Sequence, residues 1–262
     1  MLCIDHLTTG YGNHPIGHNL CANLQRGRLT ALLGPNGAGK STLLRTLAGF
    51  QPPLSPPAEG ADQHSILRIN NKDLASYTPR ELARTLSVVL TYRPEADALT
   101  AGEVVEMGRI PYARMLATQS DEDQKAVKRA LQLTRTESFI KRPLHTLSDG
   151  ERQRIFIAKA LAQATPVILL DEPTAFLDFP SKVAILRLLS HLAHKEEKTI
   201  LLSTHDVELA LQFADTLWLL RADGITEGSP EFLAQNGEMA RFFGHEGISF
   251  DATTMRFIYH KQ

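Results

Sequence analysis

Four short hydrophobic runs, uninterrupted by polar residues at alternate positions, are the clearest pattern along the chain. They are Leu29–Leu33, Val167–Leu170, Thr199–Ser203 and Thr216–Leu220. Such runs are typical of parallel strands in a sheet that is buried on both faces, so we expect helices to cover both faces. Turn residues or a helix follow the first three runs. Strands that alternate with helices predict an α/β fold.

The N-terminal part has a different pattern, with short strands separated by turns. We expect antiparallel strands at 1–7, 18–24 and 66–69. Residues 50–65 contain four prolines and are predicted to form a loop. The N-terminal part is therefore predicted to be an antiparallel β region attached to the α/β core.

The middle of the chain is predicted to be helical. One helix is expected at 101–109, and another at 121–133 with Ser120 as its N-cap. Residues 93–160 then form a helical insertion, or subdomain, between strands of the core. Towards the end of the chain, a further helix-like stretch is expected at 230–243.

Composition narrows the class of protein. The chain has 262 residues, of which 43% are hydrophobic, and we treat 1–262 as a single domain. The formal net charge of -1 creates no overall field that would attract nucleic acid, and we expect no nucleic-acid partner.

The first seven residues lack a signal-peptide pattern, and no run reaches the roughly 18 apolar residues of a membrane span. A role at a membrane would therefore depend on a partner chain.

Two cysteines and two histidines in the N-terminal part raise the question of a metal site. Cys3 and Cys21 are too few for a disulfide framework and are interpreted as ordinary strand residues of a reducing compartment. His14 and His18 precede Cys21 at a spacing that could suggest metal binding. A proline and a glycine between the histidines favour a surface turn, which is our interpretation of this stretch.

The strongest functional motif follows the first hydrophobic run, at Gly34–Ser41. It matches the phosphate-binding pattern G-x-x-x-x-G-K-[ST] between a predicted strand and a helix at 42–47, the context that this pattern requires. Glycines let backbone N–H groups turn onto phosphate oxygens, and the helix N-terminus adds partial positive charge. Lys40 can reach the β- and γ-phosphates, and the Ser41 hydroxyl can hold Mg²⁺. The candidate nucleotide-binding residues are Gly34, Pro35, Asn36, Gly37, Ala38, Gly39, Lys40, Ser41 and Thr42.

Two carboxylates end the second hydrophobic run. Asp171 and Glu172 follow Val167–Leu170, and such groups beside a buried strand are costly unless they have partners or a function. Taken alone, the pattern favours a strand that simply ends at a polar turn. Because a phosphate loop is present as well, we interpret Asp171 as a Mg²⁺ ligand, direct or through water. Glu172 is then placed to polarise an attacking water as the general base.

A helix start and a histidine are two further candidates. Ser148 can cap a helix with Glu151 three residues later, and this capping box is a sufficient structural explanation of that motif. A helix N-terminus with Gly150 in its first turn is also a phosphate-binding feature, and both interpretations can hold. His205 follows the third hydrophobic run, where a lone histidine is usually structural. Beside the predicted phosphate site, it can hydrogen-bond the γ-phosphate.

The order and spacing of these motifs resemble the ATP-binding subunit of ABC transporters over almost the whole chain. The resemblance implies a P-loop ATPase that uses ATP and Mg²⁺, with Lys40, Glu172 and His205 as catalytic residues and Ser41 and Asp171 at the metal. It also implies a signature motif that binds ATP across a dimer interface, an aromatic residue that stacks on adenine, and a D-loop. The signature corresponds to Ser148, Asp149, Gly150 and Glu151. The stacking aromatic residue corresponds to Tyr11, and the D-loop to Asp178 with the three residues before it.

Two positions depart from the family pattern. The usual signature is Leu-Ser-Gly-Gly-Gln, whereas Leu147–Glu151 is Leu-Ser-Asp-Gly-Glu. The two acidic side chains lie where the signature should meet a γ-phosphate. Two like charges about 7 Å apart, with an effective dielectric of about 20, repel each other by roughly 2 kcal/mol. Asp149 and Glu151 are therefore expected to weaken ATP-driven closure, unless Glu151 turns back into its capping box. The glutamine usual after an early strand is replaced by Thr91 or Tyr92, whose hydroxyl can contact metal-bound water.

Residues Leu99–Arg109 resemble importers of iron–siderophore complexes, haem or cobalamin within the family. The resemblance implies a second copy of the chain, integral-membrane permease subunits and a solute-binding protein as partners. It also implies a cytoplasmic location on the inner face of the membrane. Two alternatives are a soluble ABC-type ATPase not coupled to transport and a nucleotide-binding regulator with little catalysis. The first usually has long insertions, coiled coils or a second ATPase domain, none of which is found in this sequence. Intact Glu172 and His205 argue against the second, whereas Asp149 and Tyr92 leave it open.

Overall fold

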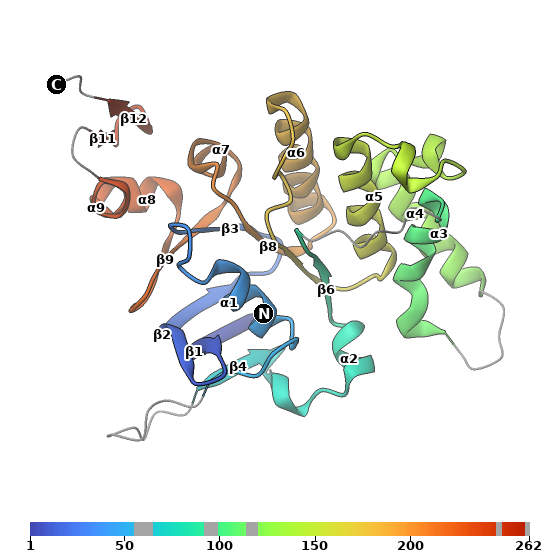
Figure 1. Cartoon of the computed structure of the whole chain (residues 1–262), viewed down its shortest axis with the longest axis horizontal. Helices are drawn as coiled ribbons and strands as arrows, with labels where there is room; N and C mark the ends of the chain where they lie inside the picture. The colour runs from blue at the N-terminus through green and yellow to red at the C-terminus, as the bar shows by residue number, and fades with distance from the viewer. Residues whose placement is uncertain (55–64, 92–98, 114–119, 245–247, 260–262) are drawn as a thin grey trace.

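The computed structural model describes residues 1–54, 65–91, 99–113, 120–244 and 248–259. Within them, a six-stranded sheet has the order β10-β9-β3-β8-β7-β6 (Figure 1). Neighbouring strands are parallel except β9 and β10, which are antiparallel. The strands are β3 (Leu29–Leu33), β6 (Leu86–Val89), β7 (Val167–Leu170), β8 (Thr199–Ser203), β9 (Thr216–Arg221) and β10 (Gly224–Gly228). All four predicted core strands are confirmed, and β9 is one residue longer than expected.

Successive residues of the core strands face two separate hydrophobic cores, one on each side of the sheet. On β9, for example, Leu217 and Leu219 belong to one core, and Trp218 and Leu220 to the other. Because side chains alternate between the faces of a strand, burial of both faces leaves no position for polar residues. This arrangement explains the uninterrupted hydrophobic runs of the sequence.

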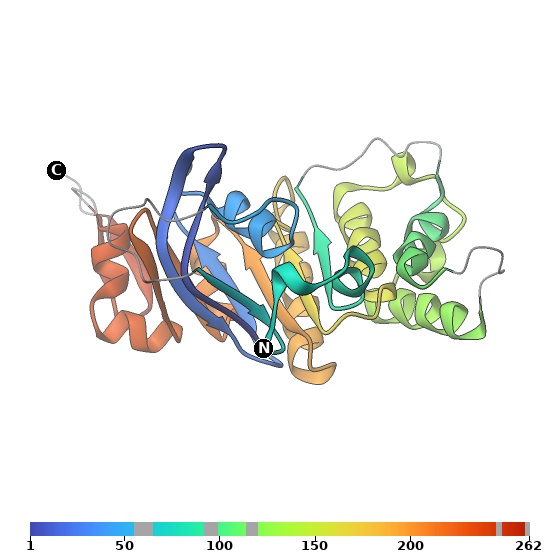
Figure 2. The same cartoon turned by 90° about the horizontal axis from the view of Figure 1, so that it is seen from below.

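The two faces of the sheet are covered differently, so the expectation of helices on both faces is wrong in part. Helices cover most of one face, among them α5, α6 and α7, and Phe250 and Phe257 from the C-terminal part pack against the same core. The other face carries α1 and an antiparallel sheet of order β2-β1-β4-β5 (Figure 2). The elements are α1 (Lys40–Leu47), α5 (Asp149–Ala162), α6 (Phe179–Lys195), α7 (Val207–Phe213), β1 (Leu2–Tyr11), β2 (His14–Leu24), β4 (Ile66–Ile69) and β5 (Lys72–Asp73). The predicted antiparallel region is therefore a covering layer of the core.

The chain between β6 and β7 is mainly helical, as predicted. This region contains α3 (Ala101–Glu106), a 3₁₀ helix (Met107–Tyr112), α4 (Asp121–Thr134), two further short 3₁₀ helices (Glu137–Phe139 and Leu144–Thr146) and α5, and α2 (Pro79–Ala83) precedes β6. The helix expected at 101–109 changes to a 3₁₀ helix after Glu106. A Cβ atom on Gly108 would lie 2.3 Å from the carbonyl oxygen of Lys159, so this turn packs closely on α5. Pro111 also lacks the N–H that an α-helix requires. The insertion limits of 93 and 160 stay a prediction, because residues 92–98 lie outside the described residues.

The C-terminal part also differs in detail from the expectation. Two short helices, α8 (Pro230–Gln235) and α9 (Glu238–Phe243), replace the single helix expected at 230–243. Gly237 separates them with a φ of 73°, which a glycine adopts without steric cost. A hairpin of β11 (Ile248–Asp251) and β12 (Arg256–Tyr259) follows. Among the described helices, none combines the length and apolar character of a membrane span.

Candidate functional site

Three segments that are far apart in the sequence meet at one edge of the central sheet. They follow β3, β7 and β8, which are adjacent and parallel, so their carboxyl ends lie side by side. The loop Gly34–Gly39 follows β3, Asp171 and Glu172 follow β7, and His205 lies just after β8. In α/β sheets, the carboxyl edge of the strands is the usual place for a ligand. The sequence predicted this meeting through the strands that precede each motif.

The phosphate loop has the backbone shape that its glycines permit. Gly37 and Gly39 have φ values of 79° and 93°, in the left-handed region. A Cβ atom on Gly39 would lie 2.8 Å from Cγ2 of Ile16, so β2 closes one side of the loop. Helix α1 then begins at Lys40 and directs its free N–H groups towards the loop. The loop is therefore shaped to hold an anion.

Lys40 is a buried cation at the base of this loop. Its ammonium group donates hydrogen bonds to the carbonyl oxygens of Gly34 at 2.8 Å and Pro35 at 3.0 Å. The residue is only 6% exposed. Burial lowers the pKa of Lys40, although the charges of Glu172 and Asp171 oppose that shift. A buried ammonium with only carbonyl partners is suited to an anionic ligand.

A cluster of hydroxyl groups surrounds the carboxylate of Asp171. Ser41 Oγ donates to Asp171 Oδ1 at 3.1 Å, and Ser203 Oγ donates to the same oxygen at 2.7 Å. The backbone N–H of Glu172 donates to Ser203 Oγ at 2.9 Å, which joins the two acidic positions through one serine. Carboxylate and hydroxyl oxygens are the hard ligands that Mg²⁺ prefers, so Ser41 and Asp171 fit that ion.

Glu172 and His205 form a direct pair beside this cluster. His205 Nε2 donates to Glu172 Oε1 at 2.6 Å. Glu172 has a φ of 49°, which is rare for a residue with a side chain and is held here by the hydrogen bond of its N–H group. Both side chains are partly exposed, so a water molecule can reach the carboxylate.

An open pocket of about 470 Å³ lies over this edge, lined by Ser41, Arg45, Leu90, Thr91, Asp171 and Glu172. Thr91 Oγ1 donates to the backbone carbonyl of Asp171 at 2.8 Å, so one of the two proposed substitutes for the family glutamine lies in the pocket. Tyr92, the other, lies outside the described residues.

Tyr11, at the end of β1, accepts hydrogen bonds from Thr42 Oγ1 at 3.2 Å and Arg45 Nη1 at 3.4 Å, and its ring is half-exposed.

The signature residues lie at the start of α5 and take part in the predicted capping box. Ser148 Oγ accepts from the N–H of Glu151 at 3.3 Å, and Glu151 Oε2 accepts from the N–H of Ser148 at 2.8 Å. These hydrogen bonds from Ser148, and the charge of Arg142 at 3.5 Å, lower the pKa of Glu151. The Glu151 carboxylate is thus turned back onto its own helix, one of the two arrangements that the sequence left open. Gly150 lies beside Ser181 of α6.

Asp178 caps α6, and two aromatic residues flank it. Its carboxylate accepts from the N–H of Ser181 at 3.0 Å, and hydrogen bonds from the side chain and the backbone of Ser181 lower the pKa of Asp178. Phe176 and Phe179 are 86% and 67% exposed, values far above those of ordinary apolar side chains. The signature and the D-loop are therefore neighbours on the surface, next to exposed apolar groups.

Residues 18–175 match the family model described as ABC transporter. The chain belongs to the ABC transporter family. It is 39% identical to the probable siderophore transport system ATP-binding protein YusV of Bacillus subtilis, over 86% of this chain and 79% of the relative. It is 34% identical to the ferric enterobactin transport ATP-binding protein FepC of Escherichia coli, over 92% and 86%. The dimeric structure of the ABC transporter cassette MJ0796 aligns with a TM-score of 0.71 and 27% identity, over 88% of this chain and 99% of the other.

This ABC ATPase has a polar group in its site that sequence reasoning missed. Ser203 is fully buried, yet its hydroxyl holds the side chain of Asp171 and the backbone of Glu172. The sequence showed it only as the last residue of a hydrophobic run. A serine at the carboxyl end of a buried strand, next to a strand that ends in two acids, is the signal that could have revealed it.

Ser203→Ala is expected to lower ATP turnover about 10-fold and to raise the Mg²⁺ concentration needed for half-maximal rate. The variant removes one hydrogen bond to a carboxylate, worth roughly 1.5–3 kcal/mol, and leaves the Glu172 N–H without its acceptor. Turnover measured over a series of Mg²⁺ concentrations tests this positioning role. Ser87→Ala is the matched control, because Ser87 is also buried but on β6. Equal loss in both variants, without a change in Mg²⁺ dependence, would show that Ser203 is merely structural.

Proposed function

We propose that this chain hydrolyses ATP at the carboxyl edge of its central sheet and that this drives a membrane permease. The observation that carries the proposal is the junction of Ser41, Asp171 and Ser203, with the Glu172–His205 pair beside it. This junction places hydroxyl and carboxylate ligands for a metal ion next to the phosphate loop. It also places a candidate general base there. Phosphoryl transfer requires little more than positioning and charge stabilisation, which these groups can supply.

Each residue of the site has a distinct role in the proposal. Lys40 and the loop amides of Gly34–Gly39 bind the phosphates, with Thr42 at the loop's end, and Tyr11 stacks on the adenine. Glu172 orients a water molecule and accepts its proton on the carboxylate. His205 Nε2 is hydrogen-bonded to the Glu172 carboxylate. In the ATP-bound site, His205 can instead donate a hydrogen bond to the γ-phosphate. Ser41 and Asp171 would hold Mg²⁺, which neutralises charge on the phosphates.

We further infer that the working form is a dimer. In one chain, the phosphate loop is built by β3 and α1, whereas the signature is built by α5 beside α6. A second copy would present its own Ser148 to Glu151 to the phosphate loop, with Asp178 and the exposed aromatic residues nearby at the contact. The dimeric structure of the cassette MJ0796 supports a dimer as the working form. ATP would hold the two copies together, and hydrolysis would release them.

Asp149→Gly is expected to strengthen ATP-driven dimerisation by about 3- to 10-fold. Asp149 stands where the usual signature has a glycine, so its removal takes one negative charge away from the signature and reduces repulsion there. Analytical ultracentrifugation over a range of ATP concentrations measures the effect. Asp121→Gly is the matched control, because Asp121 likewise follows a capping serine at the start of α4. An unchanged ATP dependence in Asp149→Gly would contradict this account of the signature.

We propose import of an iron–siderophore, haem or cobalamin type complex, a cargo class suggested by the relatives. YusV and FepC carry siderophore and ferric enterobactin transport in their names. The partners would be permease subunits and a solute-binding protein, and the ATPase would lie on the cytoplasmic face of the membrane. Met107 and Ile110 are exposed beside α3, which suits the helical insertion as the permease contact.

Reconstitution tests this function directly. The chain, expressed together with candidate siderophore permease subunits, is expected to co-purify with them and to drive ATP-dependent uptake of a ferric siderophore into vesicles. Uptake of haem or cobalamin instead would change the cargo only. Mg²⁺-dependent ATP hydrolysis without any permease association would contradict the transport role, and absence of hydrolysis in the complex would contradict the ATPase role.

A further inference from the structure

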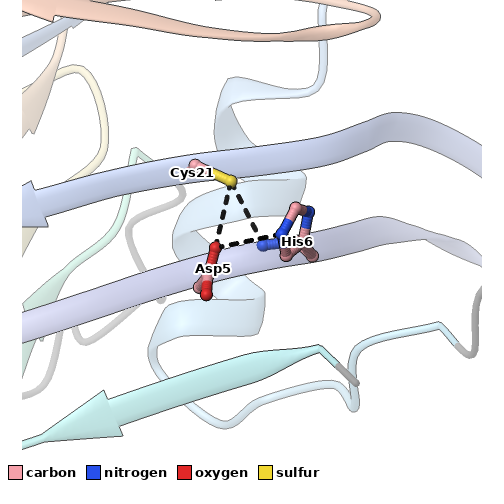
Figure 3. Close-up of side chains that lie close together, drawn as sticks. All are labelled: Asp5, His6 and Cys21. Atoms are coloured by element: carbon pink, nitrogen blue, oxygen red, sulfur yellow. Dashed lines mark hydrogen bonds and ion pairs between the residues drawn. The ribbon is translucent and has the colours of Figure 1, made fainter. Parts of the chain in front are cut away.

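A β-bulge near the start of β1 places two consecutive side chains on the same side of the N-terminal sheet. Ile4 pairs with Ala22 and Leu7 with Leu20, so three steps along β1 match two along β2. In a regular strand, consecutive side chains point to opposite faces, and an extra residue removes that alternation. Asp5 and His6 therefore both lie next to Cys21 of β2 (Figure 3).

The spacing of the three ligand atoms is that of a tetrahedral zinc site. Asp5 Oδ1 lies 3.4 Å from Cys21 Sγ and 3.5 Å from His6 Nε2. Bond lengths of about 2.0 Å to oxygen and nitrogen and about 2.3 Å to sulfur, at tetrahedral angles, give separations of about 3.5 Å and 3.3 Å. Ligand atoms of all three residues lie within 4.8 Å of one another. Little movement is needed for one ion to contact all three.

Neighbouring groups prepare His6 and Cys21 as ligands. The Nδ1 atom of His6 is hydrogen-bonded to the side-chain oxygen of Asn19. Because an amide oxygen only accepts, Nδ1 is the donor in this hydrogen bond, and Nε2, on the side of Asp5, is the ring atom available to a metal ion. A second-shell acceptor on the other ring nitrogen is typical of metal-bound histidines. The backbone N–H of His6 also donates to Cys21 Sγ at 3.2 Å, which favours the thiolate.

We propose that Asp5, His6 and Cys21 bind one Zn²⁺ ion, separate from the nucleotide site. Thiolate and imidazole ligands exclude the hard cations Mg²⁺ and Ca²⁺ and suit zinc. The three side chains are partly exposed, so water completes the coordination. Without the ion, the Cys21 thiol donates to Asp5, and burial raises the pKa of Cys21. Binding releases the thiol proton to solvent and ties β1 to β2.

Zinc titration of the tag-free full chain, freed of metal and of nucleotide, tests the proposal. Excess Mg²⁺ occupies the Ser41–Asp171 site during calorimetry. We expect one Zn²⁺ per chain, an increase in melting temperature of about 5 °C at saturation, and, with Co²⁺, a thiolate-to-metal charge-transfer band. An unchanged spectrum with Co²⁺, or no saturable zinc binding, would overturn the proposal even if every variant misfolded.

Variants locate the ion within the chain. Cys21→Ser and His6→Asn are expected to weaken zinc binding at least 100-fold, and asparagine tolerates the φ of 49° at residue 6. Asn19→Gly should weaken it about 10-fold through the orientation of His6. Cys3→Ser and His18→Asn are matched controls on β1 and β2 and should leave both zinc affinity and ATP turnover unchanged. If either control loses as much affinity as Cys21→Ser, the assignment to Asp5 and His6 is wrong.

Discussion

Glu172→Gln is expected to lower ATP turnover by at least 100-fold while leaving ATP binding intact. The amide cannot accept a proton from water, and general-base catalysis typically contributes 10²–10⁴-fold. The substitution keeps the size of the side chain, and the amide oxygen can still accept the hydrogen bond from His205 Nε2. It also removes one negative charge next to the phosphate loop, where Glu172 interacts electrostatically with Lys40. The ATP-bound dimer should therefore accumulate.

Two measurements on one preparation distinguish this outcome from a folding defect. Phosphate release gives turnover, and size-exclusion chromatography with Mg²⁺ and ATP gives the dimer fraction. Glu231→Gln is the control, because Glu231 is an exposed acid in the first turn of α8. Turnover that persists in Glu172→Gln would assign the base to another group. Loss of ATP binding together with turnover would show that Glu172 supports the fold of the site.

The sequence predicted those features of the site that depend on strand ends. Each predicted core strand is buried on both faces, so its hydrophobic run is continuous and its end is marked by a change to polar residues. The parallel order β3-β8-β7 then brings Lys40, Asp171 and His205 to one edge. To place these motifs at one edge, it is enough to recognise where each strand ends and that the strands are parallel. The detailed pairing of the strands is not needed.

Features that depend on contacts between distant segments were not predictable in this way. Ser203 has no local signal of its own, because its role lies in hydrogen bonds to residues 171 and 172. The cover of one sheet face by β1 and β2 depends on how two sheets pack together. The cluster of Asp5, His6 and Cys21 requires a bulge in β1. Without it, regular alternation would turn His6 to the face opposite Asp5.

Lys40→Met is expected to lower ATP affinity at least 100-fold without lowering the melting temperature of the nucleotide-free protein. The ammonium makes charge-assisted hydrogen bonds to phosphate oxygens, each worth roughly 1.5–3 kcal/mol, and each 1.4 kcal/mol is tenfold in affinity. Within the described part of the chain, its hydrogen-bond acceptors are the carbonyl oxygens of Gly34 and Pro35. Burial lowers its pKa, so at neutral pH the charged form reduces stability; that cost begins to fall as pH rises past the lowered pKa and is gone above the ordinary lysine pKa of 10.5. Methionine fills similar space without the charge.

The matched control for this prediction is Lys198→Met. Lys198 is also a lysine whose pKa is lowered by burial, and it donates to the carbonyl oxygen of Thr165 at 2.7 Å. It lies just before β8, at the opposite end of that strand from His205. Lys198→Met should therefore leave ATP affinity unchanged. If Lys40→Met lowers the melting temperature more than Lys198→Met does, Lys40 holds the loop together in the absence of a ligand. If the two changes are alike and only Lys40→Met loses ATP, the buried charge is kept in the protein for its substrate.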